Sequence, residues 1–287
     1  MSDISFGWRL PEQSLHLGRR PLVMGILNVT PDSFSDGGLF ADVEAAVTRG
    51  LTLIQEGADL LDIGGESSRP GARPVAVDEE IRRVLPVVEQ LVKRSSARLS
   101  IDTYKAETAR LSLAAGAQII NDITSLTGDQ AMTEVVRKAR AGVILMHMQG
   151  TPATMQLNPL YGDVVGDIGR FFEERLQALS DQGIAKEQIA LDPGIGFGKT
   201  RDHNLEILAR LGEFQRLGRP ICLGTSRKGV LGHVLNRPVH ERLAGSLATL
   251  LYAMGQGAVQ IIRVHDVAQT RDAITAFEEI RRRVRGS

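Results

Sequence analysis

The side chains able to do chemistry in this 287-residue chain follow short apolar runs. They are Asn28, Asp62, Asp102, Asn121, His147, Asp192, the stretch Thr225 to Lys228, and Arg263 with His265. One polar residue after an apolar run only solvates a strand end, but several on one rim would line a pocket with donors and acceptors. Carboxylates, amides, a lysine and an arginine suit a heterocycle with a guanidine-like edge and an anionic group at its other end.

Three loops rich in Gly, Pro, Ser and Thr follow these runs, at residues 30–38, 64–74 and 193–200. Loops beside strand ends commonly carry function. The segment Gly194 to Thr200 is one residue short of the Walker phosphate-loop spacing, so an ATPase is rejected. No acidic strand end lies at the distance that a dinucleotide-binding fold requires. His147 and His265 are far apart in sequence, with no His-x-His or Cys pair, so a zinc site is unsupported. The sequence also has no Gly-x-Ser-x-Gly nucleophile elbow.

A weak repeat organises the chain, in which a helical stretch ends near Gly and an apolar run follows. Gly just past a helix supplies a left-handed C-cap, and a short apolar run between turns indicates a strand buried on both faces. Six predicted strands each follow a Gly: Leu60–Ile63, Ile119–Asn121, Val143–Leu145, Ile189–Asp192, Ile221–Leu223 and Ile261–Arg263. The preceding glycines are, in the same order, Gly57, Gly116, Gly142, Gly183, Gly218 and Gly257. The runs Leu22–Leu27 and Arg98–Ile101 complete a set of eight.

The segments between these strands have helical periodicity. Val43, Val47, Leu51 and Ile54 share one face, and the stretch Ile81 to Leu91 repeats the pattern. Pro86 falls inside the second stretch, so that helix should be kinked or begin later than a cap at Asp78 indicates. Eight strands alternating with helices predict a single α/β (β/α)8 TIM barrel spanning residues 1–287, with its core at about 20–275. A doubly wound open sheet is the rival architecture.

Composition supports an ordinary globular enzyme. Lys and Arg together number 34, as do Asp and Glu, so the formal charge is zero. A binder of nucleic acid or anionic membrane would need a basic excess, and neither partner is expected. No apolar run of 18 residues and no basic-then-apolar leader occurs, and Cys222 lies alone in an apolar run. We therefore expect a cytoplasmic protein with Cys222 in the core.

Eight motifs occur in series along the chain. They are Gly25–Gly38, Asp62–Gly71, Ser100–Thr103, Asn121–Ile123, Met146–Gly150, Asp192–Lys199, Ser226–Lys228 and Arg263–Asp266. Together they resemble bacterial dihydropteroate synthases, of the pterin-binding family, over about residues 20–275. The resemblance implies a C–N bond-forming transferase of folate biosynthesis, which joins 6-hydroxymethyl-7,8-dihydropterin diphosphate to 4-aminobenzoate and releases diphosphate. It also implies a barrel, Mg2+, a homodimer and inhibition by sulfonamides.

The resemblance also implies roles for particular side chains. The pterin-binding set is Asp102, Asn121, Ile123, Met146, Asp192 and Lys228. Asp192 would accept the amino group and the adjacent ring N–H in bidentate fashion, as a carboxylate can. Asp102 and Asn121 would satisfy other ring nitrogens, and Lys228 would donate to the ring carbonyl or N5. Met146 and Ile123 would close the ring faces.

The remaining roles concern the two other groups of the reaction. Asn28 would hold Mg2+, while Arg263 and His265 would bind the diphosphate. The aminobenzoate set is Ser68, Arg69, Pro70, Phe197 and Ser226, closed over by Phe34 and Asp36 of the first loop. Ser68 stands where the family usually has Thr, and Gly229-Val230 where it often has Ser and a bulky apolar residue. These departures affect the shape of the aminobenzoate end.

Two other functions stay open at this point. A methyltransferase acting on methyltetrahydrofolate would share Asp102, Asn121 and Asp192, but would not be expected to keep the run Ser226–Lys228 or the first loop. A non-catalytic pterin-binding paralogue should have lost anion-site residues, which this chain retains. Binding of the pterin diphosphate and a dihydropteroate assay would separate the three functions.

Overall fold

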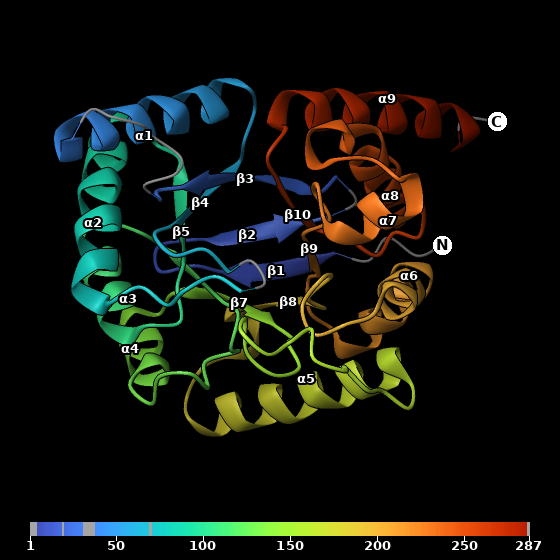
Figure 1. The fold of residues 1–287 in the computed structure, drawn as a ribbon, viewed down its shortest axis with the longest axis horizontal. Helices are drawn as coiled ribbons and strands as arrows, with labels where there is room; N and C mark the ends of the chain where they lie inside the picture. The colour runs from blue at the N-terminus through green and yellow to red at the C-terminus, as the bar shows by residue number, and fades with distance from the viewer. Residues whose placement is uncertain (1–4, 19, 31–37, 69–70, 286–287) are drawn as a thin grey trace.

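Strands lie at the centre of the molecule with helices around them (Figure 1), in a computed structural model that describes residues 5–18, 20–30, 38–68 and 71–285. Eight of the described strands are parallel and form one closed sheet. The strands are β3 (Leu22–Asn28), β4 (Leu60–Gly64), β5 (Arg98–Asp102), β6 (Ile119–Asp122), β7 (Gly142–Met146), β8 (Ile189–Asp192), β9 (Cys222–Leu223) and β10 (Ile261–Val264). They pair in the order β8-β7-β6-β5-β4-β3-β10-β9, and a parallel bridge between Leu191 and Ile221 joins the two ends. The predicted (β/α)8 barrel is confirmed, and the open sheet is excluded because the ring closes.

Helices surround this ring. They are α1 (Gly38–Gln55), α2 (Val77–Arg94), α3 (Ala106–Ala114), α4 (Met132–Ala139), α5 (Val164–Asp181), α6 (Arg201–Ala209), α7 (Gly229–Leu235), α8 (Leu243–Gly255) and α9 (Val267–Arg285), with 3₁₀ turns at Lys186–Gln188, Leu211–Leu217 and Val239–Glu241. The helix containing Pro86 begins at Val77, so of the two expected alternatives, a kink or a later start, the later start is wrong. Its acidic first turn, with Asp78, favours that start through the helix dipole. Among the described residues, no helix is long and apolar enough to cross a bilayer.

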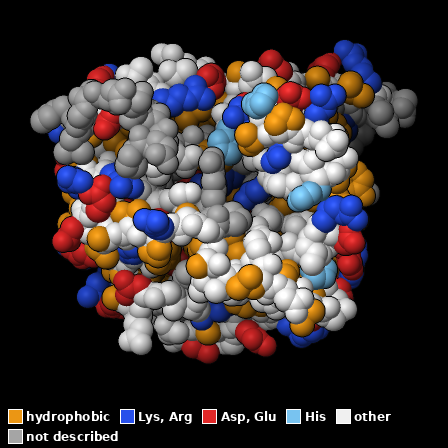
Figure 2. All heavy atoms as spheres, viewed as in Figure 1, with side chains coloured by type: hydrophobic (Ala, Val, Ile, Leu, Met, Phe, Trp, Pro, Cys, Tyr) orange, Lys and Arg blue, Asp and Glu red, His pale blue; other side chains and the backbone are white. Residues whose placement is uncertain are grey.

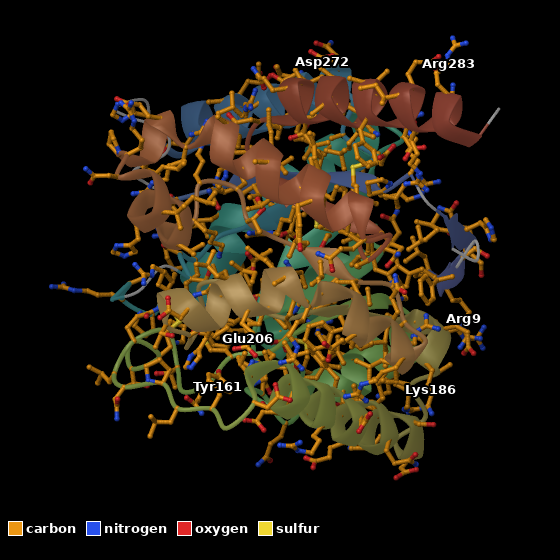
Figure 3. The ribbon with its side chains drawn as sticks, turned by 90° about the vertical axis from the view of Figure 1, so that its right-hand side faces the viewer. Arg9, Tyr161, Lys186, Glu206, Asp272 and Arg283 are labelled. Atoms are coloured by element: carbon orange, nitrogen blue, oxygen red, sulfur yellow. The ribbon has the colours of Figure 1, made fainter. Side chains whose placement is uncertain are left out.

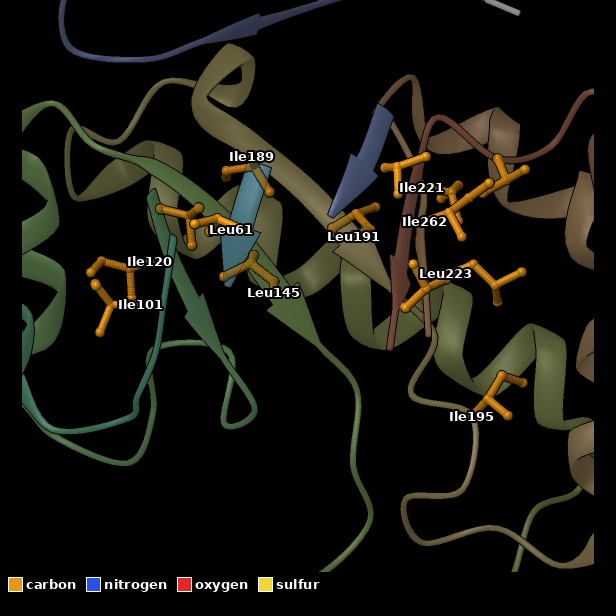
Figure 4. Close-up of a cluster of buried hydrophobic side chains, with 14 of the residues drawn as sticks. Leu61, Ile101, Ile120, Leu145, Ile189, Leu191, Ile195, Ile221, Leu223 and Ile262 are labelled. Atoms are coloured by element: carbon orange, nitrogen blue, oxygen red, sulfur yellow. The ribbon is translucent and has the colours of Figure 1, made fainter. Parts of the chain in front are cut away.

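Side chains on the outer face of the strands pack against the helices. Figure 4 shows part of this layer, in which Leu61, Ile101, Ile120 and Leu145 come from successive strands and are fully buried. Successive side chains of a strand point to opposite faces, so the neighbours of these residues point into the barrel. The helix layer therefore holds the strands from outside and leaves their inner positions for the site.

A short N-terminal hairpin closes one end of the barrel, and sequence analysis did not predict it. Strands β1 (Phe6–Arg9) and β2 (Ser14–Leu17) pair antiparallel. Trp8 is fully buried among inward residues of the barrel and donates its indole N–H to the carbonyl of Gln188, at 2.9 Å. In Figure 3, Arg9 of this hairpin and Lys186 lie near one end of the molecule, and Tyr161 lies near the other. The hairpin thus occupies the end opposite the carboxyl ends of the strands.

Gly142 has a different role from the one predicted. The left-handed residue after α4 is Arg140, with φ 52°, and Gly142 is already the first residue of β7. A Cβ on Gly142 would lie 2.4 Å from Leu10 Cδ2, beside the hairpin. A larger residue there would force the buried Leu10 side chain to move, because the hairpin packs against this part of β7. By contrast, the predicted left-handed conformation is present at Gly57, Gly116, Gly183, Gly218 and Gly257.

The described surface mixes charges of both signs. On the face shown in Figure 2, basic and acidic side chains alternate around the periphery. Cys222 is fully buried, as expected, and burial raises the pKa of its thiol well above the ordinary value. Neither observation points to a partner that binds through a uniform field of positive charge.

Candidate active site

The site begins where the inner face of the barrel changes from apolar to polar. Five strands each carry an apolar inward residue near the hairpin. Two positions further along, four of them carry a predicted site residue, and β4 carries Asp62. The pairs are Leu60 and Asp62, Ile119 and Asn121, Ile144 and Met146, Ala190 and Asp192, and Ile261 and Arg263. A period of two keeps both members of each pair on one face. The carboxyl ends of the strands therefore present a layer of mostly polar groups above an apolar floor.

Arg263 bridges two carboxylates across the interior of the barrel. Its Nε donates to Asp62 Oδ2 at 2.5 Å, and its Nη2 donates to Asp102 Oδ2 at 2.6 Å. In the sheet, β10 is separated from β4 by β3 and from β5 by both β3 and β4. These contacts therefore pass through the inside of the ring. The bridge brings together Arg263 and Asp102, which were predicted for different parts of the substrate.

Asp62 is the centre of this network. Its side chain is fully buried and accepts hydrogen bonds from Ser100 Oγ at 2.6 Å and Asn121 Nδ2 at 3.0 Å, besides the one from Arg263. A carboxylate can only accept, so Asp62 fixes the amide of Asn121 with its NH2 group turned toward Asp62. Sequence analysis placed Asp62 at a strand end but gave it no role. Its position on the inner face is the signal that could have suggested one.

Burial changes the acidity of the charged groups. It raises the pKa of Asp102 to about 7, opposed by Arg263 and reinforced by Asp62. Burial also disfavours the charged form of Arg263, but Asp62 and Asp102 outweigh this effect and raise the pKa of the guanidinium. For Asp192, burial raises the pKa, while the hydrogen bond from Gly194 N and the charges of Lys228 and other nearby cations oppose it. The site thus holds several charges away from water, a frequent property of functional sites.

An apolar wall lies beside these polar groups. Ile123, Met146, Met155 and Phe197 are buried together in one cluster. Lys228 Nζ lies 4.1 Å from the centroid of the Phe197 ring, within the range of a cation–π contact. Ile123, Met146, Phe197 and Lys228 were all predicted for the site, and the structure brings them together.

Ser226, which follows β9, is in hydrogen-bond contact with His265, which follows β10. Ser226 Oγ lies 3.0 Å from His265 Nδ1 and accepts a hydrogen bond from the His265 backbone N–H at 3.2 Å. Beside them, Arg227 and Asp266 form an ion pair, with Nε to Oδ2 at 3.0 Å. Sequence analysis assigned Ser226 to the aminobenzoate and His265 to the diphosphate, so their contact makes these two regions adjacent.

The other predicted residues lie at the rim or outside the described part of the chain. Asn28 ends β3 and is half-buried, and Ser68 is half-buried in the loop after β4. Phe34, Asp36, Arg69 and Pro70 lie outside the described residues.

Glu66, which sequence analysis did not assign, accepts hydrogen bonds from Val75 N at 2.9 Å and Tyr104 Oη at 2.7 Å. These contacts close the base of the loop that contains Ser68.

Comparison with known proteins identifies the family. Residues 24–265 match the pterin binding enzyme family. The dihydropteroate synthase of Escherichia coli (strain K12) is 50% identical over 258 residues, which cover 90% of this chain and 91% of that protein. The chain belongs to the dihydropteroate synthase family. Its activity is that of this family, a transferase reaction that forms a C–N bond, and the predicted function is confirmed.

Solved dihydropteroate synthases have the same fold. A Yersinia pestis dihydropteroate synthase in complex with a sulfonamide drug superimposes with a TM-score of 0.90 at 46% identity, covering 96% of this chain and 99% of that one. A Xanthomonas albilineans dihydropteroate synthase in complex with 7,8-dihydropteroate gives a TM-score of 0.83 at 45% identity, covering 93% of this chain and 96% of that one. The fold is therefore shared over nearly the full length of each chain.

Proposed function

We propose that this chain makes 7,8-dihydropteroate with the pterin ring held inside the barrel mouth by Asp102, Asn121, Asp192 and Lys228. The single observation that carries the proposal is the polar layer above the apolar floor, in which Arg263 joins Asp62 and Asp102 across the ring. The Asn121 NH2 group donates a hydrogen bond to Asp62, so Asn121 Oδ1 can accept a hydrogen bond from a ring N–H of the pterin. Asp192 uses one oxygen for Gly194 N and retains lone pairs on both oxygens for the amino edge of the pterin.

The diphosphate would leave toward Asn28, Arg263 and His265. The two bonds to carboxylates use two of the five N–H donors of the Arg263 guanidinium, so further donors can meet an oxyanion. The methylene C–O bond breaks with its electron pair passing to the diphosphate, and the amine lone pair forms the C–N bond before a proton leaves the nitrogen. An aniline nitrogen is neutral near pH 7, so the step needs no strong base.

A magnesium ion fits this arrangement. The described residues contain no group of three or more His, Cys, Asp or Glu side chains suited to a metal. The amide oxygen of Asn28 is a hard ligand, and magnesium commonly binds through few protein ligands together with substrate phosphates. When bound, the ion would neutralise charge on the diphosphate.

The second substrate would bind against the apolar wall. Phe197 and Ser226 lie at the strand ends, and we propose that Ser68, Arg69 and Pro70 complete an aminobenzoate site that Phe34 and Asp36 close. A sulfonamide offers the same aniline nitrogen, so we expect it to compete at this site and to act as an alternative nucleophile.

Diphosphate release tests the order of bond changes. If the C–O bond breaks before the amine attacks, we expect slow diphosphate release from the pterin substrate without 4-aminobenzoate. Magnesium removal should depress this partial reaction at least tenfold, because developing charge on the diphosphate loses its counter-ion. Arg69→Ala is the matched control, which should raise the aminobenzoate KM and leave the partial reaction intact. Release that depends strictly on the amine would favour a concerted displacement.

We also propose a homodimer, formed through α7 and α8. Val234, Leu235, Val239 and Tyr252, on α7, α8 and the turn between them, are large apolar residues exposed to solvent. Light scattering at micromolar concentration should give twice the chain mass of 31.2 kDa. Replacing Val239 and Tyr252 with glutamate should shift the mass to that of one chain, because burying two charges opposes association. A single-chain mass for the unmodified protein at about 50 µM would contradict the dimer.

A further inference from the structure

The glycine-rich segment Gly194 to Thr200 carries a lysine whose role the reaction does not explain. In the structure the Lys199 side chain is turned inward and is only 3% exposed. Its Nζ lies 2.8 Å from the Phe197 carbonyl oxygen, 3.2 Å from the His147 carbonyl oxygen and 3.0 Å from His147 Nδ1. An ammonium has three N–H donors, and these three atoms can all accept. The cation is therefore bound by the protein itself.

The position of Lys199 depends on an unusually close approach of two strand ends. Gly194 has φ 71°, and a Cβ there would lie 2.0 Å from the His147 carbonyl oxygen and 3.3 Å from Lys199 Nζ. The His147 N–H donates to the Asp192 carbonyl at 2.9 Å, and Gly194 N donates to Asp192 Oδ1 at 2.7 Å. Lys199 thus lies against the turn that sets the direction of the Asp192 side chain.

The electrostatics of the pair favour a donor lysine and an acceptor histidine. Burial, reinforced by the charge of Lys199, lowers the pKa of His147 to about 3, so its ring is neutral at physiological pH. Burial lowers the pKa of Lys199 to about 7, and Asp192 opposes this shift while Lys228 adds to it. The three acceptors around Nζ bind the ammonium form and so act in the same direction as Asp192. Together with Lys228 and Arg263, Lys199 supplies the positive charge that faces the Asp192 carboxyl.

We propose that Lys199 is a positioning residue for both substrate sites. Its ammonium ties residues 193–200 to the end of β7 and so holds Phe197 against the aminobenzoate and Asp192 against the pterin. The inference rests on the proposed function, because Phe197 and Asp192 take their roles from it. Lys199 touches neither substrate and acts through these two residues.

Lys199→Met tests the proposal, because methionine fills similar space without charge or donors. We expect the aminobenzoate KM to rise about fivefold or more, since the Phe197 carbonyl loses its partner. We also expect the acid-side midpoint of pterin diphosphate binding, measured by calorimetry over a series of pH values, to rise as Asp192 loses a nearby cation. Lys199→Arg, which keeps charge and donors, should return that midpoint toward the unmodified value.

Arg219 provides the matched control at the opposite end of β8. It is also a buried cation, and it donates to the backbone carbonyls of Ile189 at 3.0 Å, Gly7 at 3.1 Å and Gly218 at 3.3 Å. Arg219→Met should lower the Tm and leave both KM values and the binding midpoint unchanged. If Lys199→Met does not fold, Lys199→Gln tests the binding midpoint, since it removes the charge and keeps an amide donor.

The outcomes separate this inference from the proposed function. A folded Lys199→Met protein with unchanged KM values and an unchanged midpoint overturns the positioning role. The same changes in Arg219→Met would also overturn it, because they would then follow from any loss of a buried cation. An unmodified protein that forms no dihydropteroate would instead refute the proposed function.

Discussion

Arg263→Met is expected to destabilise the protein by about 3–5 kcal/mol and to abolish most of its activity. The Arg263 side chain is only 18% exposed and is bonded to Asp62 and Asp102, and removing one partner of such a largely buried ion network leaves uncompensated charge. Urea unfolding at pH 7.5 measures the free energy of unfolding, and the dihydropteroate assay measures activity. A loss of stability below about 1 kcal/mol would contradict the stabilising role of the bridge, and unchanged activity would contradict its role in the site.

The pH dependence of this effect has a defined sign. Burial holds the pKa of Asp102 at about 7 even with Arg263 in place, and loss of the cation raises it further. A carboxyl whose pKa is higher in the folded state costs stability as pH rises above its unfolded value of about 4. The additional loss from Arg263→Met should therefore be largest above pH 7 and become smaller as the pH falls. Adding Asp102→Asn should recover part of the stability at high pH, because it removes the unpaired charge.

Asp192→Asn is expected to weaken binding of the pterin diphosphate by about 10-fold to 100-fold, the equivalent of roughly 1–3 kcal/mol for an unpaired polar group. The Gly194 N–H already donates to Asp192 Oδ1 at 2.7 Å. In the variant the amide oxygen must face Gly194, which turns the NH2 group toward the donor edge of the pterin. Two donors would then meet where the carboxylate accepted, and calorimetry at fixed magnesium would measure the loss.

Asp59→Asn is the control for this substitution. Asp59 accepts a hydrogen bond from Val23 N at 2.8 Å and pairs with Arg271, near the amino ends of the strands and away from the polar layer. Its variant should lower the Tm without changing pterin affinity. Unchanged pterin affinity in Asp192→Asn would place the amino edge of the ring elsewhere in the barrel.

Much of this architecture follows from local pattern. Short apolar runs spaced by helical segments predict eight parallel strands, because only strands buried on both faces tolerate such runs. Polar residues at their carboxyl ends predict a rim, since parallel strands all end on one side of the barrel. Asp102, Asn121, Asp192 and Arg263 were found in this way, and the series of motifs added the reaction and the family.

The hairpin of β1 and β2 was missed for a physical reason. Each strand has only four residues, and an isolated pair of such strands has little stability of its own. The hairpin is stable here because Trp8 and Leu10 are buried in the open end of the barrel. The role of Gly142 was misjudged for the same reason, because the residue that it accommodates lies more than a hundred positions away.

Closure of the barrel also determined which charged side chains come into contact. Arg263 lies 201 positions from Asp62 and 161 from Asp102, so no local pattern could pair them. Lys199 resembled the lysine of a phosphate loop by sequence, yet packing of β7 beside β8 turned it onto His147. Residue types and their period thus defined the strands and the polar rim. Pairings across the ring, and the environment that sets each pKa, depend on contacts that exist only after the chain has closed on itself.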